Sequence, residues 1–270
     1  MASVEDTFET GRLGVQTMEN RKDTDAKAIP IILLHGFGGF AAQWRPLQLR
    51  LSTHAPTLAF DLPGHGESMN YPGFGPPKRA AEAVLAEMKA RSIDKAVVVG
   101  HSMGGAVASL MALLEPSRIE RLVLLAPGGF GEAFNHDHLM KWAAAREESE
   151  LARIMPTFFA PGFDLPAKAI TLQANLRAKP GLVEALVKIG ASMAKDGKQG
   201  VLPLEAMAKT GVPIHVLWGT KDAILPVEQA EALSAPFAVT LLEGVGHSPA
   251  EESPAEVERA ILGQSPSDNG

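Results

Sequence analysis

Six short apolar runs, each followed by a glycine-containing turn, constrain the fold of this 270-residue chain more than any other feature. Runs of four to six residues rich in Val, Ile and Leu are typical of strands buried on both faces of a parallel sheet. Stretches of helical length and pattern separate several of them, which indicates helices that cover both faces of that sheet. The six runs are Ile29–Leu34, Thr57–Phe60, Ala96–Val99, Leu122–Leu125, Ile214–Trp218 and Val239–Leu242.

The chain departs from this alternation at its beginning. Thr7–Thr10 and Leu13–Thr17 are strand-like and flank a Gly11-Arg12 turn, so we expect an antiparallel hairpin at the edge of the sheet.

A second departure lies between the fourth and fifth apolar runs. Asp137–Leu151 and Leu182–Met193 have helical patterns, and several prolines separate them. We therefore predict a helical cap over residues 132–204, inserted into an α/β core formed by residues 1–131 and 205–270.

Composition limits the kind of partner. The formal net charge is −6 and the basic residues are scattered, which argues against a nucleic-acid partner. The acidic, polar first thirty residues lack the pattern of a secretory signal, and no apolar run is long enough to cross a bilayer. We expect a cytoplasmic protein without a membrane partner, present as a monomer or homodimer. The chain has no cysteine, so a disulfide, a thiol nucleophile and a thiolate metal site are excluded.

The strongest chemical signal is Gly100-His-Ser-Met-Gly-Gly105, which lies between an apolar run and a helical stretch. A serine in such a strand-to-helix turn presents its hydroxyl at a helix N-terminus, where developing negative charge is favoured. Ser102 is therefore the candidate nucleophile. The alternative is a serine that only caps the helix.

A serine hydroxyl needs a general base. Of the eight histidines, His247 is the best candidate, because it follows the last apolar run in a glycine turn. His101 adjoins the serine but should point away from it. His35 and His65 are assigned to loops, His215 to the core, and His136 and His138 to the cap, whereas His54 has no assigned role.

The base needs a carboxylate to orient it, and the expected chain order is serine, acid, histidine. Asp222 fits this order, in the turn after Ile214–Trp218. Its alternative role is that of an ordinary turn aspartate. Asp61 precedes the serine, and its expected role is to fix its own turn.

The oxyanion of an acyl-transfer intermediate needs hydrogen-bond donors. We expect these to be the backbone N–H groups of Met103 and of Phe37, the latter in the glycine loop His35–Gly39. A dinucleotide-binding loop is the alternative, but Gly36-Phe-Gly-Gly-Phe-Ala41 departs from that fingerprint at the position of its third glycine.

Taken together, these motifs resemble the α/β-hydrolase superfamily. The resemblance covers about residues 7–263 except the cap. It implies an eight-stranded, mostly parallel sheet and a Ser-Asp-His triad. Arg121–Gly131 is also similar to the hydrolase module of some acetoin dehydrogenase acetyltransferase components. C–C bond hydrolases of aromatic degradation are another similar branch, although the proline common in their first glycine loop is absent here. Epoxide hydrolases and haloalkane dehalogenases have Asp where Ser102 stands.

The predicted function is hydrolysis of a small ester or related acyl compound without a cofactor or a metal. C–C bond cleavage, peracid formation or acyl transfer by the same triad remain alternatives, as does a non-catalytic binding protein with this fold. The candidate lining of an apolar substrate pocket comes from the cap: Phe134, Met140, Trp142, Phe158 and Phe159.

Overall fold

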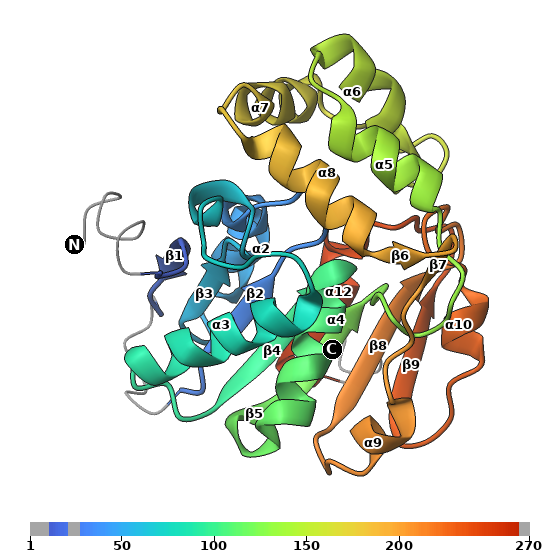
Figure 1. Cartoon of the computed structure of the whole chain (residues 1–270). Coiled ribbons are helices and arrows are strands. Elements are labelled where there is room, and N and C mark those ends of the chain that lie inside the picture. Colours follow the sequence, from blue (N-terminus) through green and yellow to red (C-terminus); the bar gives the residue numbers. More distant parts are fainter. Residues whose placement is uncertain (1–10, 21–27, 265–270) are drawn as a thin grey trace.

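A computed structural model describes residues 11–20 and 28–264, which fold around a mostly parallel sheet (Figure 1). Its seven described strands have the order β1-β3-β2-β4-β5-β8-β9. β1 runs antiparallel to β3, and every other neighbouring pair is parallel. The strands are β1 (Val15–Met18), β2 (Ile31–Leu34), β3 (Thr57–Phe60), β4 (Ala96–His101), β5 (Ile119–Leu125), β8 (Ile214–Gly219) and β9 (Phe237–Leu242).

The predicted doubly covered α/β fold is confirmed. All six apolar runs form strands, and the second strand of the predicted hairpin corresponds to β1. The other strand of that hairpin, Thr7–Thr10, lies outside the described residues.

Alternation of side chains along the strands builds one apolar core on each face of the sheet. Ile32 and Val98 point to the face that α3 and α4 cover. Leu33 and Val99 point to the opposite face, which α2 and α12 cover. The helices and 3₁₀ turns that accompany the sheet are η1 (Ala41–Trp44), α2 (Arg45–Leu51), η2 (Gly66–Ser68), α3 (Pro77–Ala90), α4 (Met103–Leu114), η3 (Pro116–Arg118), α9 (Leu204–Ala208), α10 (Glu228–Glu231), α11 (Pro249–Glu252) and α12 (Pro254–Leu262).

α9, which precedes β8, lies at the bottom of Figure 1, but the longer segment before it, residues 136–199, lies in the upper half, above the point where β4 passes into α4. Its elements are α5 (His136–Ala144), α6 (Glu148–Ile154), η4 (Met155–Phe158), α7 (Ala167–Arg177), α8 (Leu182–Ser192), β6 (Ala194–Lys195) and β7 (Lys198–Gln199). The short β6–β7 hairpin is not anticipated by the sequence.

The helical pattern over Asp137–Leu151 forms two helices rather than one. Ala145 has an extended backbone (φ −61°, ψ 135°), which ends α5. The Glu150 carboxylate then accepts hydrogen bonds from the N–H groups of Arg146 (2.9 Å) and Glu147 (3.0 Å). These bonds stabilise a new helix start, because the first N–H groups of a helix have no partner within it.

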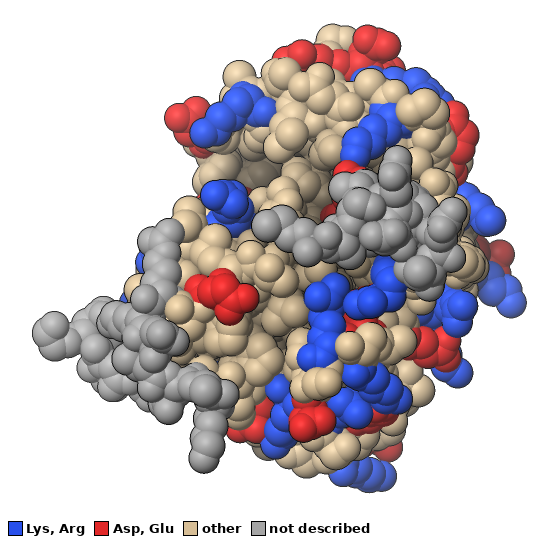
Figure 2. Space-filling view, turned by 90° about the vertical axis from the view of Figure 1, so that its left-hand side faces the viewer, with Lys and Arg blue, Asp and Glu red and all other residues tan. Residues whose placement is uncertain are grey.

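The surface carries mixed charge. On the face drawn in Figure 2, Lys and Arg side chains are interspersed with Asp and Glu side chains. None of the helices in the described ranges combines the length and the apolar character needed to cross a membrane.

Candidate active site

Ser102 occupies a sharp turn between β4 and α4. Its backbone has φ 52° and ψ −117°, a conformation that costs free energy for a residue with a side chain and that is found at functional turns. Gly100 and Gly104 make the turn possible, because a Cβ at either position would meet a backbone carbonyl: that of Gly104 or of Leu34, respectively. The predicted strand-turn-helix arrangement is therefore present.

His247 lies between Ser102 and Asp222. Its Nδ1 is 2.7 Å from Asp222 Oδ2, and its Nε2 is 3.0 Å from Ser102 Oγ. Because the carboxylate can only accept, Nδ1 carries the proton and Nε2 presents its lone pair to the hydroxyl. The other carboxylate oxygen of Asp222 accepts from the N–H groups of Ile224 and Leu225 at 2.8 and 2.9 Å, which fixes its orientation.

The topology explains why these three residues meet. Ser102 follows β4, Asp222 follows β8 and His247 follows β9. These strands are parallel, and only β5 separates β4 from β8, so their carboxyl ends meet at one edge. The side chains of Asp222 and His247 are almost completely buried, and low solvent access strengthens hydrogen bonds between polar groups.

The loop after β2 lies directly beside the serine. A Cβ at Gly36 would come within 3.2 Å of Ser102 Cβ, so the backbone just before Phe37 approaches the serine closely. Met103 begins α4, and its N–H is one of those left without a partner within the helix. The oxyanion role of the Phe37 and Met103 N–H groups stays a prediction.

Two residues to which the sequence analysis gave no functional role hold the loop of His247. The Nε2–H of His101 donates to the backbone oxygen of His247 at 2.6 Å. The carboxylate of Glu252 accepts from the N–H groups of Gly246 (3.0 Å) and Ser248 (3.2 Å), which flank His247. It also accepts from Ala160 (2.8 Å), in the segment between β5 and β8.

Two buried histidines connect the loops around the site. His35 Nδ1–H donates to Gly36 O at 2.8 Å, and its Nε2 accepts from Leu62 N–H at 3.0 Å. His65 Nε2 accepts from Gly38 N–H at 3.1 Å. Burial disfavours the charged imidazolium, so it lowers the pKa of His65 to about 4 and that of His35 well below the usual value. Both histidines therefore stay neutral and structural.

Asp61 has the local role that the sequence predicts. Its oxygens accept from the N–H groups of Glu67 at 3.1 Å, in its own turn, and of Ala41 at 2.6 Å, beyond the first glycine loop. Burial raises the pKa of Asp61, although these hydrogen bonds act against the shift. Both oxygens are thus engaged away from His247.

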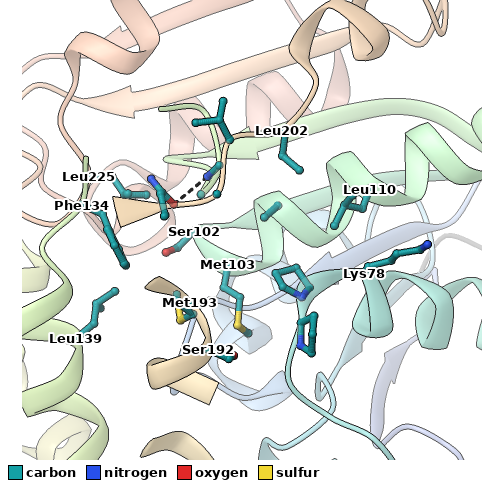
Figure 3. Close-up of a pocket in the computed structure, with 18 of the residues that line it drawn as sticks. Lys78, Ser102, Met103, Leu110, Phe134, Leu139, Ser192, Met193, Leu202 and Leu225 are labelled. Atoms are coloured by element: carbon teal, nitrogen blue, oxygen red, sulfur yellow. Dashed lines mark hydrogen bonds between the residues drawn. The ribbon is translucent and has the colours of Figure 1, made fainter. Parts of the chain in front are cut away.

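An apolar cavity of about 330 Å³ opens on Ser102 (Figure 3). Met103, Ala106 and Leu110 of α4 form one wall. Phe134 and Leu139 lie near the serine in Figure 3, whereas Lys78 lies at the opposite end. The remaining lining residues are Pro76, Pro77, Gly128, Gly129, Ser192, Met193, Gln199, Gly200, Val201, Leu202, Ile224 and Leu225.

Of the five residues predicted to line a pocket, the structure places only Phe134 at this cavity. Trp142 instead donates from Nε1 to Phe37 O at 3.2 Å and so supports the first glycine loop. Phe158 packs on Trp142 and His247, with ring centroids 5.2 and 6.2 Å away. Phe159 stacks on Phe163 at 4.7 Å, and Met140 packs beside Gly190. The apolar side chains of residues 132–204 indicated which segment contributes to the cavity, but not which way each side chain points.

Three of the remaining histidines have structural partners. His136 Nε2 is 3.1 Å from Gly190 O, and His138 packs on the Phe158 ring at 5.2 Å. His215 is half-buried, with Nε2 2.8 Å from Thr240 Oγ1 of the neighbouring strand. Within residues 11–20 and 28–264, no group of three or more His, Asp or Glu side chains is arranged to hold a metal ion.

Comparison with known proteins identifies relatives over most of the chain. Residues 31–260 match the sequence profile of the alpha/beta hydrolase family. The chain is 34% identical, over 86% of its length, to a dihydrolipoyllysine-residue acetyltransferase component of an acetoin cleaving system from Pseudomonas putida. It is 30% identical, over 87% of its length, to the component of the same name from Cupriavidus necator. The matched region spans 62% of each of these longer relatives.

Solved structures agree on the fold. A 2-hydroxy-6-oxo-6-phenylhexa-2,4-dienoate hydrolase from Rhodococcus superimposes with a TM-score of 0.77 at 21% identity, over 93% of this chain and 98% of that one. A meta-cleavage product hydrolase from Pseudomonas fluorescens gives a TM-score of 0.80 at 19% identity, over 93% of each chain.

Proposed function

This chain belongs to the alpha/beta hydrolase family, and from that premise we propose that it is a serine hydrolase that cleaves a small ester or related acyl compound. The observation that carries the proposal is the hydrogen-bonded series from Ser102 Oγ through His247 to Asp222, with distances of 3.0 and 2.7 Å. In this series a base and its orienting acid act on one hydroxyl.

In the proposed acylation step, Ser102 Oγ attacks the carbonyl carbon of the substrate and its proton passes to His247 Nε2. The carbonyl oxygen becomes an oxyanion, which the N–H groups of Phe37 and Met103 stabilise. The carbon–oxygen bond to the leaving group then breaks, and the imidazolium returns its proton to the departing alcohol. Asp222 stabilises the positive charge on His247 throughout this step.

In deacylation, His247 Nε2 takes a proton from water as the water oxygen attacks the acyl carbon. The second tetrahedral intermediate collapses, the bond to Ser102 Oγ breaks, and the proton returns to Oγ. The acid product leaves and the enzyme returns to its starting state.

We assign substrate selection to the proposed cap, residues 132–204. The cavity supports this assignment, because Phe134, Leu139 and Met193 line it from that segment, whereas Ser102 and Ala106 line it from the core. A substrate in the cavity would therefore contact both parts.

Ser102→Ala tests the proposed nucleophile. We expect hydrolysis of p-nitrophenyl acetate to fall by about 10⁴-fold or more and fluorophosphonate labelling to be lost, with an unchanged melting temperature. Ser109→Ala is the matched control: it removes another buried hydroxyl of α4, which donates to Gly105 O at 2.8 Å, and should leave activity intact. Hydrolysis retained by Ser102→Ala would refute the nucleophile.

A second candidate, cleavage of a carbon–carbon bond, is suggested by the similarity to meta-cleavage product hydrolases. Peracid formation and acyl transfer by the same residues are further alternatives. Assays with p-nitrophenyl esters, a vinylogous 1,5-diketone, hydrogen peroxide and alcohol acceptors separate these reactions. A properly folded protein that does not label at Ser102 would instead support a binding role.

A further inference from the structure

We infer that the cavity beside Ser102 binds an unbranched, medium-length acyl chain, close to eight to ten carbons, along the face of α4. This inference rests on the proposed serine-hydrolase function. It adds a substrate class and names Ala106 and Leu110 as the residues that determine chain length.

The spacing of the lining residues along α4 defines the direction of the cavity. Met103, Ala106 and Leu110 recur at three and four residues, so they lie on one face of the helix. Ser102 is at the N-terminal end of that face, and Figure 3 places Leu110 and Lys78 at the other end. The small side chain of Ala106 leaves the space between them open.

Helix geometry gives the length. The eight residues from Ser102 to Leu110 advance the helix by about 12 Å. An extended chain advances about 1.3 Å per bond, because three bonds span about 3.8 Å along a peptide unit. About nine bonds therefore fit between the nucleophile and the outer end, which corresponds to an octanoyl or decanoyl group.

The volume and chemistry of the walls favour a single flexible chain. The cavity, about 330 Å³, is at the small end of the range for ligand pockets, about 300–1,000 Å³. Phe134 is the one aromatic side chain among its lining residues, so a ring would find few stacking partners in the described cavity. Leu, Met, Val and Ile side chains supply most of the apolar wall. At the outer end Lys78 is exposed, and longer chains would emerge into water there.

The position of His247 indicates that the cavity holds the acyl part of the ester rather than the alcohol part. His247 must protonate the leaving group, so the alcohol lies on the imidazole side of Ser102. From Ser102 the cavity extends along α4 as far as Leu110, and His247 is absent from its lining. Phe158, which packs on His247, is also absent from that lining. The portion that stays bonded to Oγ after the first step is therefore the portion that the cavity can hold.

A series of p-nitrophenyl esters from acetate to dodecanoate tests the inference. We expect kcat/KM to rise with each pair of carbons, by up to about fourfold for each methylene that becomes fully buried, and to level off or fall beyond decanoate. A companion series of acetates of alcohols, from ethanol to decanol, should show no comparable rise. A flat acyl series, an acetate optimum, a preference for benzoate, or a rise confined to the alcohol series would overturn the inference.

Two variants locate the chain. Ala106→Phe obstructs the groove about 6 Å from Ser102 and should move the optimum to butyrate, lowering kcat/KM for octanoate by at least tenfold relative to butyrate. Leu110→Trp should lower kcat/KM for the decanoate ester relative to that for the hexanoate ester. Leu114→Phe, at a 41% exposed position of the same helix, should leave the profile unchanged. Unchanged profiles in both groove variants would overturn the assignment.

Labelling at Ser102 separates failure of this inference from failure of the proposed function. A small fluorophosphonate should label the wild type and Leu114→Phe alike, since it needs only the nucleophile and its base. If Ser102 is labelled but kcat/KM does not depend on acyl chain length, only the assignment of the cavity to an acyl chain is rejected. Absence of labelling and of hydrolysis of every ester rejects the serine hydrolase itself.

Discussion

The substitution Glu252→Gln tests how the position of the general base is maintained. The Glu252 carboxylate accepts three backbone N–H groups, and two of them, from Gly246 and Ser248, flank His247. The third comes from Ala160. Glutamine keeps one side-chain oxygen but replaces the other with an N–H₂ donor, which cannot accept from a backbone N–H. At least one of the three hydrogen bonds must therefore be lost.

The expected magnitude follows from the charge on the acceptor. Hydrogen bonds to charged groups contribute about 1.5–3 kcal/mol, and 1.4 kcal/mol corresponds to a tenfold change in rate. If that loss is expressed as misplacement of His247, kcat falls by about tenfold to one hundredfold. Glu252 does not line the cavity, so KM for a short ester should change by less than about twofold.

The assay combines steady-state hydrolysis with the rate and endpoint of fluorophosphonate labelling. Misplacement of the base predicts slow labelling that still reaches one label per chain, whereas partial unfolding predicts a low endpoint. Glu243→Gln, an exposed position in the same loop as His247, is the matched control and should behave as the wild type. A Glu252→Gln protein with the wild-type kcat and labelling rate would refute the reasoning.

Two further predictions concern stability and the serine turn. Burial lowers the pKa of His65 from 6.5 to about 4 and that of His101 to about 3, so on acidification the unfolded chain takes up protons first. The contribution of these two histidines to the free energy of unfolding is therefore complete above about pH 6.5. It falls toward pH 4 by about 1 kcal/mol per pH unit for each histidine. Equal midpoints of urea unfolding at about pH 7 and pH 5 would contradict this. Gly104→Ala should destabilise the protein by about 1–3 kcal/mol and slow Ser102 labelling, because the new Cβ meets Leu34 O. Gly200→Ala, which has open space at its Cβ, should neither destabilise the protein nor slow labelling. A Gly104→Ala protein with the wild-type melting temperature would show that the turn can accommodate a Cβ.

The framework of the site was predictable because it depends on local signals. Apolar runs identified the strands, and glycine turns marked their carboxyl ends. Parallel strands bring such ends together, so the order of Ser102, Asp222 and His247 along the chain was enough to predict that they meet. Their distances confirm that they do.

The support of the site was not predictable, because it depends on contacts between distant segments. Glu251 and Glu252 are adjacent and chemically identical in the sequence, yet only the turn after His247 brings the second beside Ala160. The cavity was missed for a related reason. Its space arises where side chains are small, at Ala106, Gly128 and Gly129, whereas three of the four aromatic residues that the sequence analysis selected, Trp142, Phe158 and Phe159, fill space elsewhere.

The pairing of β5 with β8 has a consequence for how the protein folds. Leu122 and Ile214 are register partners although about 90 residues separate them, the widest such separation among the described strands. Closing so long a loop is entropically costly and slow, so the pairing of β5 with β8 should form late in folding. Ser102 lies before β5 in the chain, whereas Asp222 and His247 lie after β8. A nascent chain can thus complete the serine turn while remaining chemically inert, and reactivity is acquired only when the two halves of the sheet come together.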